Sequence, residues 1–148
     1  MTVNDARPMR WWDIPDVIAI EESVFPATAW SPAQFWSELA QDDRTYLVAE
    51  ISGRLVAYAG VMVRPPTADI QTIAVDADCR GRGIGRDLLD RLLRVAEGDG
   101  CSEVLLEVNA DSAPAVALYE SAGFEMISRR SSYYGPGQDA LIMRRRRP

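Results

Sequence analysis

The sequence predicts an α/β fold built on a mixed, largely antiparallel sheet flanked by about four helices. β-rich runs follow one another before residue 76, a long helical stripe comes next, and strand and helix patterns then alternate to the end. Short strand runs joined by tight turns are typical of antiparallel pairing, whereas a doubly wound sheet needs regular strand–helix alternation throughout. Because no repeat or linker-like segment interrupts the chain, we expect a single domain spanning residues 1–148.

The first third of the chain predicts a short strand and two helices separated by an apolar loop. Asp13 ahead of Pro15 is typical of a helix start, because an N-cap side chain accepts an N–H and proline fits the first turn. Ser31 ahead of Pro32 repeats this signal for the second helix. The loop between them, Phe25–Trp30, is unusually rich in large apolar groups.

The rest of the chain predicts a hairpin-linked group of strands followed by strand and helix elements. A long helix is indicated by apolar residues recurring at helical spacing, among them Ile84, Leu88 and Leu92. Its end is expected at Gly98, because glycine favours the turn that closes a helix. In order, we expect strands over residues 45–51, 55–63 and 69–75, a helix over 83–97, a strand over 104–108, a helix over 112–122, and strands over 124–128 and 140–143.

Composition excludes several classes of site and of partner. The chain has no histidine and no lysine, so a zinc site, a histidine-dependent triad or a Walker-type phosphate loop is not expected, and we predict no metal. A net charge of −6 argues against a general nucleic-acid binder. The longest apolar run, residues 55–63, is too short to cross a bilayer, and residues 1–8 lack a signal-peptide pattern. We therefore expect a cytoplasmic protein with no membrane partner and no specific nucleic-acid partner.

The chain ends in four consecutive arginines, Arg144–Arg147. One interpretation is a solvated end that keeps the chain soluble. The other is weak electrostatic attraction to RNA or a ribosome. The sequence leaves both open.

A glycine-rich segment with the sequence R-G-R-G-I-G lies between a strand and the start of the long helix. The first turn of a helix has unpaired N–H groups and about half a positive charge, and glycines let a ligand approach the backbone closely. The segment is therefore suited to a pyrophosphate, although a flexible turn without a ligand remains the alternative. The dinucleotide pattern G-x-G-x-x-G fails, because Arg86 occupies its last glycine position. The residues of the segment are Arg80, Gly81, Arg82, Gly83, Ile84 and Gly85.

Two side chains further along supply an acid–base pair. Glu107 lies within an apolar strand, where loss of hydration would favour its protonated form, the adjustment that a general base near neutral pH needs. A carboxylate at a sheet edge is the alternative interpretation. Tyr119, twelve residues later, would by itself be a core aromatic more often than a catalyst. Together, however, a carboxylate that can take a proton and a phenol that can donate one form an acid–base pair without histidine.

These motifs resemble the GNAT superfamily of N-acetyltransferases, because R-G-R-G-I-G fits its R-x-x-G-x-G pattern and Ile73–Asp76 resembles the strand before it. Within that superfamily the chain is most similar to the RimI-type ribosomal-protein-alanine N-acetyltransferases. The resemblance covers roughly residues 70–143 and is carried by the segments Leu106–Val108, Ala117–Ser121, Gly123–Phe124, Tyr133–Tyr134 and Asp139–Ala140, with Phe25–Pro26 and Trp30–Ser31 near the start.

The resemblance implies acetyl-CoA as donor and a role for each matching residue. The backbone amides of Arg82, Gly83 and Gly85 would hold the pyrophosphate, and Ile73 and Val75 would pair with the pantetheine arm. Glu107 would act as base through water and Tyr119 as the acid for the coenzyme thiolate. Ser112, where the family has asparagine, would cap the last helix and contact the coenzyme. The remaining implied contacts are Ala74, Arg80, Gly81 and Ile84 with the coenzyme, and Phe25, Trp30, Tyr133 and Tyr134 with the acceptor.

The resemblance and elementary acid–base chemistry together favour a protein N-terminal amine as acceptor, with the N-terminal alanine of a ribosomal protein as the specific hypothesis. Freeing a lysine amine at pH 7.5 costs about 4 kcal/mol, against about half of one for an α-amine. A single water-relayed carboxylate therefore suffices for the α-amine. Two alternatives stay open: an acetyltransferase of small cationic amines, and a non-catalytic module that binds acyl-CoA.

Overall fold

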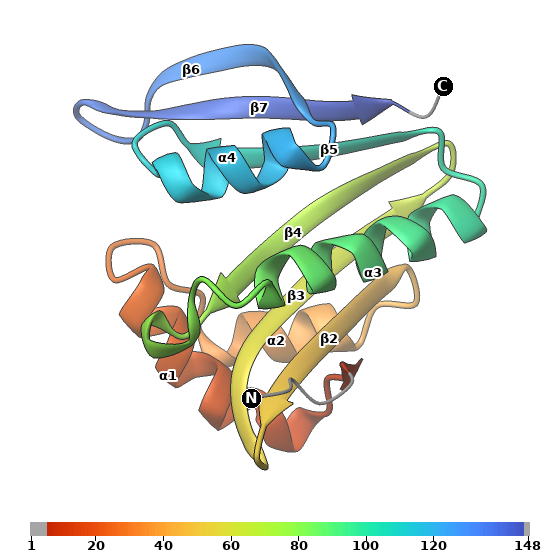
Figure 1. The fold of residues 1–148 in the computed structure, drawn as a ribbon, viewed down its shortest axis with the longest axis vertical. Coiled ribbons are helices and arrows are strands. Elements are labelled where there is room, and N and C mark those ends of the chain that lie inside the picture. Colours follow the sequence, from red (N-terminus) through yellow and green to blue (C-terminus); the bar gives the residue numbers. More distant parts are fainter. Residues whose placement is uncertain (1–5, 147–148) are drawn as a thin grey trace.

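The computed structural model describes residues 6–146, which form a seven-stranded sheet with helices on both faces (Figure 1). The strand order is β1-β2-β3-β4-β5-β7-β6, and every neighbouring pair is antiparallel except β4–β5. The predicted mixed, largely antiparallel sheet is confirmed. The strands are β1 (Arg7–Pro8), β2 (Arg44–Ile51), β3 (Arg54–Arg64), β4 (Thr67–Val75), β5 (Glu103–Asn109), β6 (Glu125–Gly135) and β7 (Gln138–Arg146); the helices are η1 (Trp11–Asp13), α1 (Ile14–Val24), α2 (Pro32–Leu39), η2 (Ala77–Cys79), α3 (Ile84–Gly98) and α4 (Ala113–Ser121).

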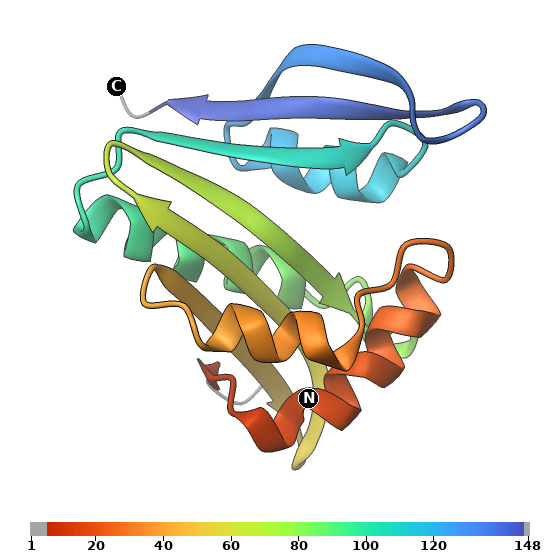
Figure 2. The ribbon, with the colours of Figure 1, turned by 180° about the vertical axis from the view of Figure 1, so that it is seen from behind.

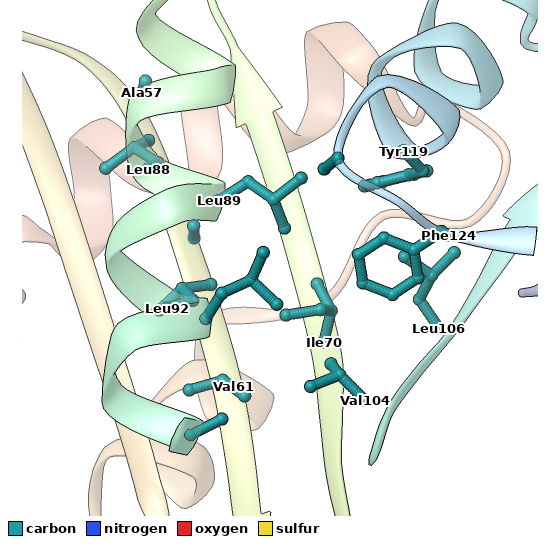
Figure 3. Close-up of a cluster of buried hydrophobic side chains, with 14 of the residues drawn as sticks. Ala57, Val61, Ile70, Leu88, Leu89, Leu92, Val104, Leu106, Tyr119 and Phe124 are labelled. Carbon is teal, nitrogen blue, oxygen red and sulfur yellow. The ribbon is translucent and has the colours of Figure 1, made fainter. Parts of the chain in front are cut away.

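The helices form two layers, each over its own core. α3 and α4 lie on one face, where Leu88, Leu89 and Leu92 of α3 pack with Ile70 and Leu106 of the sheet (Figure 3). α1 and α2 cover the other face of β2, β3 and β4 over a second buried cluster. Figure 2 shows that, within residues 6–146, no helix covers that second face of β5, β7 and β6. One half of the sheet is therefore open on the side opposite α4.

Both predicted starts of the N-terminal helices are confirmed, but one capping side chain is used differently. Ser31 caps α2 as expected, accepting the Gln34 N–H at 3.2 Å, and the Gln34 side chain returns a bond to the Ser31 N–H at 2.7 Å. Asp13 makes no capping bond to α1. Its carboxylate instead accepts from the Arg7 guanidinium and from the Arg10 N–H, each at 2.8 Å. The Asp13 side chain thus links β1 to η1.

A buried carboxylate fixes the loop between α1 and α2. Glu21 is only 2% exposed, and it accepts a hydrogen bond from the Tyr58 hydroxyl of β3 and another from the Trp30 N–H at 3.0 Å. Burial, reinforced by the Glu21 carboxylate, raises the pKa of Tyr58 well above its ordinary value, so the phenol keeps its proton and donates. Glu21 therefore ties the end of the Phe25–Trp30 loop to the sheet.

A β-bulge in β4 changes which residues face each layer. Ile70 pairs with Val61 of β3 and Thr72 pairs with Gly60, so Gln71 is one residue too many on the β4 side. Opposite the bulge, the Tyr46 ring lies over Gly60, where a Cβ would clash with it. After the bulge the two faces of β4 are exchanged relative to the residues before it.

The last two strands extend beyond their predicted ends, and this corrects the interpretation of the arginine-rich end. Arg144–Arg146 belong to β7 rather than to a solvated tail, and Arg147 lies outside the described residues. Arg145 pairs with Glu97 at 2.9 Å and donates to the Ala122 carbonyl at 3.0 Å.

None of the helices within residues 6–146 has the length and apolar character needed to span a membrane.

We predict that Glu21→Ala destabilises the protein, because it leaves the Tyr58 hydroxyl and the Trp30 N–H without their acceptor. Each buried group left unpaired costs about 1–3 kcal/mol, so the free energy of unfolding should fall by roughly 2–5 kcal/mol in urea titrations. Glu22→Ala is the matched control, because the Glu22 side chain is next to Glu21 in the sequence but is exposed. This substitution should change the free energy of unfolding by less than about 0.5 kcal/mol. Equal urea midpoints for the two variants would contradict this anchoring role.

Candidate active site

The parallel pair β4–β5 is held together at one end only. Thr67–Asp69 pair with Glu103–Leu105, and the two strands then separate towards their C-terminal ends (Figure 1). Within the described chain, the edge of β4 from Ile70 to Val75 that faces β5 has no strand partner. The backbone N–H and C=O groups on this edge are therefore available to a ligand that offers amide groups, apart from the Val75 carbonyl, which accepts a long hydrogen bond from Arg80.

The glycine-rich segment follows β4 and η2 and opens α3. Gly81 and Gly83 both have φ of +79°, a left-handed conformation that favours glycine, and a Cβ at either position would meet no atom within 4 Å. Gly83 is the N-cap, and the first bond into the helix runs from the Asp87 N–H to its carbonyl at 3.0 Å. In residues 6–146, the N–H groups of Gly83, Ile84 and Gly85 donate to no backbone carbonyl. These N–H groups are therefore available to a ligand at the start of α3, and the binding of an anion there stays a prediction.

Other residues of this segment attach α3 to its neighbours. A Cβ on Gly85 would lie 3.5 Å from Val75 and 3.6 Å from Leu118, so this glycine lets α3 approach β4 and α4 closely. Arg86, which the sequence only marked as breaking the dinucleotide pattern, donates to the carbonyl and hydroxyl of Ser121 at 3.2 and 3.0 Å. These contacts fix the start of α3 beside α4.

The two arginines of the segment lie at the surface. Arg80 donates weakly to the Val75 carbonyl at 3.4 Å. Arg82 lines an open cavity on the outside of the segment, together with Arg54 and Cys79 among others. Neither Glu107 nor Tyr119 lines this cavity, so the acid–base pair belongs to a different part of the surface.

Tyr119 lies in α4 on the helix-covered side of the split. It is 8% exposed, and its ring packs edge-to-face on Phe124 with centroids 5.9 Å apart (Figure 3). Burial, with a smaller effect from Tyr134, raises the pKa of Tyr119 to about 12. The phenol is thus a neutral hydrogen-bond donor throughout the physiological pH range.

Glu107 lies on the opposite face of the sheet, and its predicted burial is wrong. Its side chain is 42% exposed, and its nearest cation is the Arg130 guanidinium, 4.0 Å away. The neighbouring Val104, Leu106 and Val108 are buried because alternate residues of β5 face α4, and Glu107 belongs to the other set. β5 therefore has one buried and one more exposed face, although its sequence is mostly apolar.

The tyrosine pair predicted to contact an acceptor lies on β6, close to Glu107. The rings of Tyr133 and Tyr134 are 5.2 Å apart, and the Arg130 guanidinium carbon is 5.4 Å from the Tyr133 centroid. Burial raises the pKa of Tyr134, and the charge of Glu107 contributes to the rise. The second group, Phe25 and Trp30, packs instead against the core under α1 and α2. The turn between β6 and β7, which follows Tyr134, and the loop between α1 and α2 lie at the same end of the molecule (Figures 1 and 2).

The remaining predicted coenzyme contacts lie along the split. Ile73 and Val75 pack towards the α3 side, whereas Ala74 is buried under α1 and α2, so only its backbone reaches the free edge of β4. Ser112 is the N-cap residue of α4, but its hydroxyl makes no capping bond, contrary to the sequence prediction. The sequence did not single out Asp69, the last β4 residue paired with β5. Only the strand register shows that Asp69 lies on the same face of the sheet as Glu107.

Comparisons with known proteins agree with this architecture. Residues 10–124 match the family described as "Acetyltransferase (GNAT) family". N-alpha-acetyltransferase RimI of Mycobacterium tuberculosis is 44% identical over 121 residues, covering 78% of this chain and 75% of that protein. [Ribosomal protein bS18]-alanine N-acetyltransferase of Escherichia coli K12 is 33% identical over 144 residues, covering 95% of this chain and 96% of that protein.

Solved structures and a longer relative complete the comparison. The crystal structure of the ribosomal-protein-S18-alanine N-acetyltransferase from Escherichia coli superposes with a TM-score of 0.88 at 32% identity, over 98% of this chain and 94% of that one. The uncharacterized protein ML0378 of Mycobacterium leprae is 40% identical over 139 residues, but the chain spans only 38% of its length. From the family match and these identities, the chain belongs to the GNAT family of acetyl-CoA-dependent N-acetyltransferases.

Proposed function

We propose that the protein transfers the acetyl group of acetyl-CoA to the N-terminal α-amine of a protein, specifically to the N-terminal alanine of a ribosomal protein in the cytoplasm. The observation that carries the proposal is the placement of Tyr119 and Glu107 on opposite faces of the sheet beside the split between β4 and β5. The printed names of the Escherichia coli and Mycobacterium tuberculosis relatives support the acceptor class.

In this proposal the coenzyme enters from the side of α3 and α4. The amides of Arg82, Gly83 and Gly85 hold its pyrophosphate at the positive end of α3, and Arg80 adds a cationic donor. The pantetheine arm pairs with the free edge of β4 at Ile73 and Val75, because its amide groups replace the missing strand partner. Ser112 offers a free hydroxyl at the start of α4. The thioester then reaches the split between the strands.

The chemistry follows from the two faces of the sheet. Glu107, acting through a water molecule, takes the proton that the α-amine loses as its nitrogen attacks the thioester carbonyl. The tetrahedral intermediate collapses, the C–S bond breaks, and the phenol of Tyr119 donates a hydrogen bond or its proton to the departing thiolate. A phenol with a pKa of about 12 remains protonated until that step.

The open face of β5, β7 and β6 favours a peptide acceptor over a small amine. In the described part of the chain no helix covers this face, so an extended peptide can reach Glu107 past Tyr133 and Tyr134, with the Phe25–Trp30 loop at the same end.

Acetyl-CoA consumption with a peptide that begins with alanine would support the proposal. Consumption of acetyl-CoA with polyamines alone would contradict the proposal and indicate a small-amine acetyltransferase. Tight binding of the coenzyme without turnover would indicate a non-catalytic binding module.

Glu107→Gln is expected to lower kcat/KM for an alanine peptide by on the order of a hundredfold or more, while the Kd for acetyl-CoA stays the same. Glu103→Gln is the matched control, because it removes a carboxylate from the same face of β5 but at the closed end of the split. Steady-state kinetics and calorimetry measure the two quantities. Wild-type rates for Glu107→Gln would exclude this residue as the base.

Tyr119→Phe is expected to lower kcat on the order of tenfold to a hundredfold, by the same factor at every pH from 6 to 10. The factor is constant because burial raises the pKa of Tyr119 to about 12, so its proton is present across that range. A pH–rate profile of both proteins tests this. A loss that grew with pH would instead indicate a phenolate acting as base.

Gly83→Ala is expected to weaken coenzyme binding at least about tenfold, because its Cβ would occupy the space in front of the free amides of α3. Gly100→Ala is the matched control: φ is +91° there, a Cβ also meets nothing within 4 Å, and it follows the other end of α3. Both variants should lose roughly 1–2 kcal/mol of stability from the left-handed backbone. If calorimetry gave them equal coenzyme affinities, the pyrophosphate would have to bind elsewhere.

A further inference from the structure

Asp69 lies at the point where β4 and β5 begin to separate. It is the last residue of β4 paired with β5, opposite Leu105, and paired residues of parallel strands direct their side chains to the same face. Glu107 follows two residues after Leu105 and shares that face. Ala68 and Ile70, on either side of Asp69, are buried in the α3-side core, so Asp69 faces the side of the sheet opposite α3, next to the open face of β5.

The Asp69 carboxylate is half-buried and, within residues 6–146, makes no hydrogen bond or ion pair. The charged groups facing it are Arg64 of β3 and Glu103 and Glu107 of β5. Arg64 already donates to Asp43 at 2.8 Å. Burial raises the pKa of Asp69, opposed by Arg64 and reinforced by Glu107 and Glu103. Because its one neighbouring cation is engaged and both other neighbours are anions, Asp69 lacks a positive partner.

We propose that Asp69 is a positioning residue for the acceptor: it binds the α-ammonium group and brings the nitrogen beside Glu107. This rests on the proposed function and adds a second carboxylate to its acceptor site. An α-amine has a pKa of about 7.8, so most of the acceptor arrives charged at pH 7. Asp69 makes a charge-assisted hydrogen bond to that ammonium. Glu107 takes one proton from it through water, which leaves the neutral amine, and releases that proton to solvent before it takes the second proton, which the nitrogen loses as it attacks the thioester. Asp69 therefore acts on acceptor affinity, and Glu107 acts on the chemical step.

The test is the KM for an alanine peptide at two pH values. Asp69→Asn is expected to raise KM about tenfold at pH 7.0, as loss of one charged hydrogen bond would, with kcat within about threefold. At pH 9.0, where the α-amine is largely neutral, the ratio of variant to wild-type KM should approach one. Asp69→Glu, which restores the charge, should recover KM to within about threefold at pH 7.0.

Glu103→Gln controls for the general charge of this face, and its KM is expected to change less than about threefold. Thermal melting of each variant checks folding. An unchanged KM for Asp69→Asn at pH 7.0, or an equal rise at both pH values, would overturn the ammonium-binding role while leaving the proposed function in place. Absence of wild-type turnover with any α-amine peptide would overturn the proposed function and this inference with it.

Discussion

The site depends on the interruption of one parallel ladder. β4 and β5 pair over three residues and then diverge, which leaves polar backbone on β4 without a strand partner in the described chain. Unpaired backbone groups are costly when they are removed from water, so the missing bonds at the interruption must be supplied by water, by another element or by a ligand. The same divergence gives access to both faces of the sheet at one point. Without it, Tyr119 and Glu107 would lie on two sides of a continuous sheet.

Contacts that hold the two halves of the sheet together lie on the helical side. Gly85 lets the first turn of α3 approach Leu118 of α4, and Arg86 bonds to Ser121 at the end of α4. Arg145 of β7 adds an ion pair to Glu97 near the end of α3. These contacts fix α4, and with it Tyr119, relative to the helix start at which the pyrophosphate is proposed to bind. The packing of α3 on α4 thus sets how the proposed acid lies relative to the proposed phosphate site.

Local signals predicted much of this arrangement, and the misses share one cause. The Ser31 cap, the stripe on α3 and the glycine segment were all visible because each depends on residues close in sequence. The exposure of Glu107 was not predicted, because Leu105 made the run Val104–Val108 look apolar throughout, although Val104, Leu106 and Val108 share one face of β5 and Glu107 lies on the other. The length of β6 was missed because its residues are exposed on both faces and show no alternation. Asp69 carries no local signal, since its meaning depends on which β5 residue it pairs with.

The bulge at Gln71 makes residues before and after it alternate differently along β4. Asp69 and Ile73 are four residues apart, and in a regular strand their side chains would point to the same face. The extra residue reverses the alternation, so Asp69 faces away from α3 while Ile73 and Val75 face α3. Gly60 permits this, because the Tyr46 ring occupies the position of the missing Cβ opposite the bulge. A single inserted residue thereby separates the side of the strand proposed to meet the acceptor from the side proposed to meet the coenzyme. It explains why the proposed ammonium contact and the proposed pantetheine contact can share one strand without competing for space.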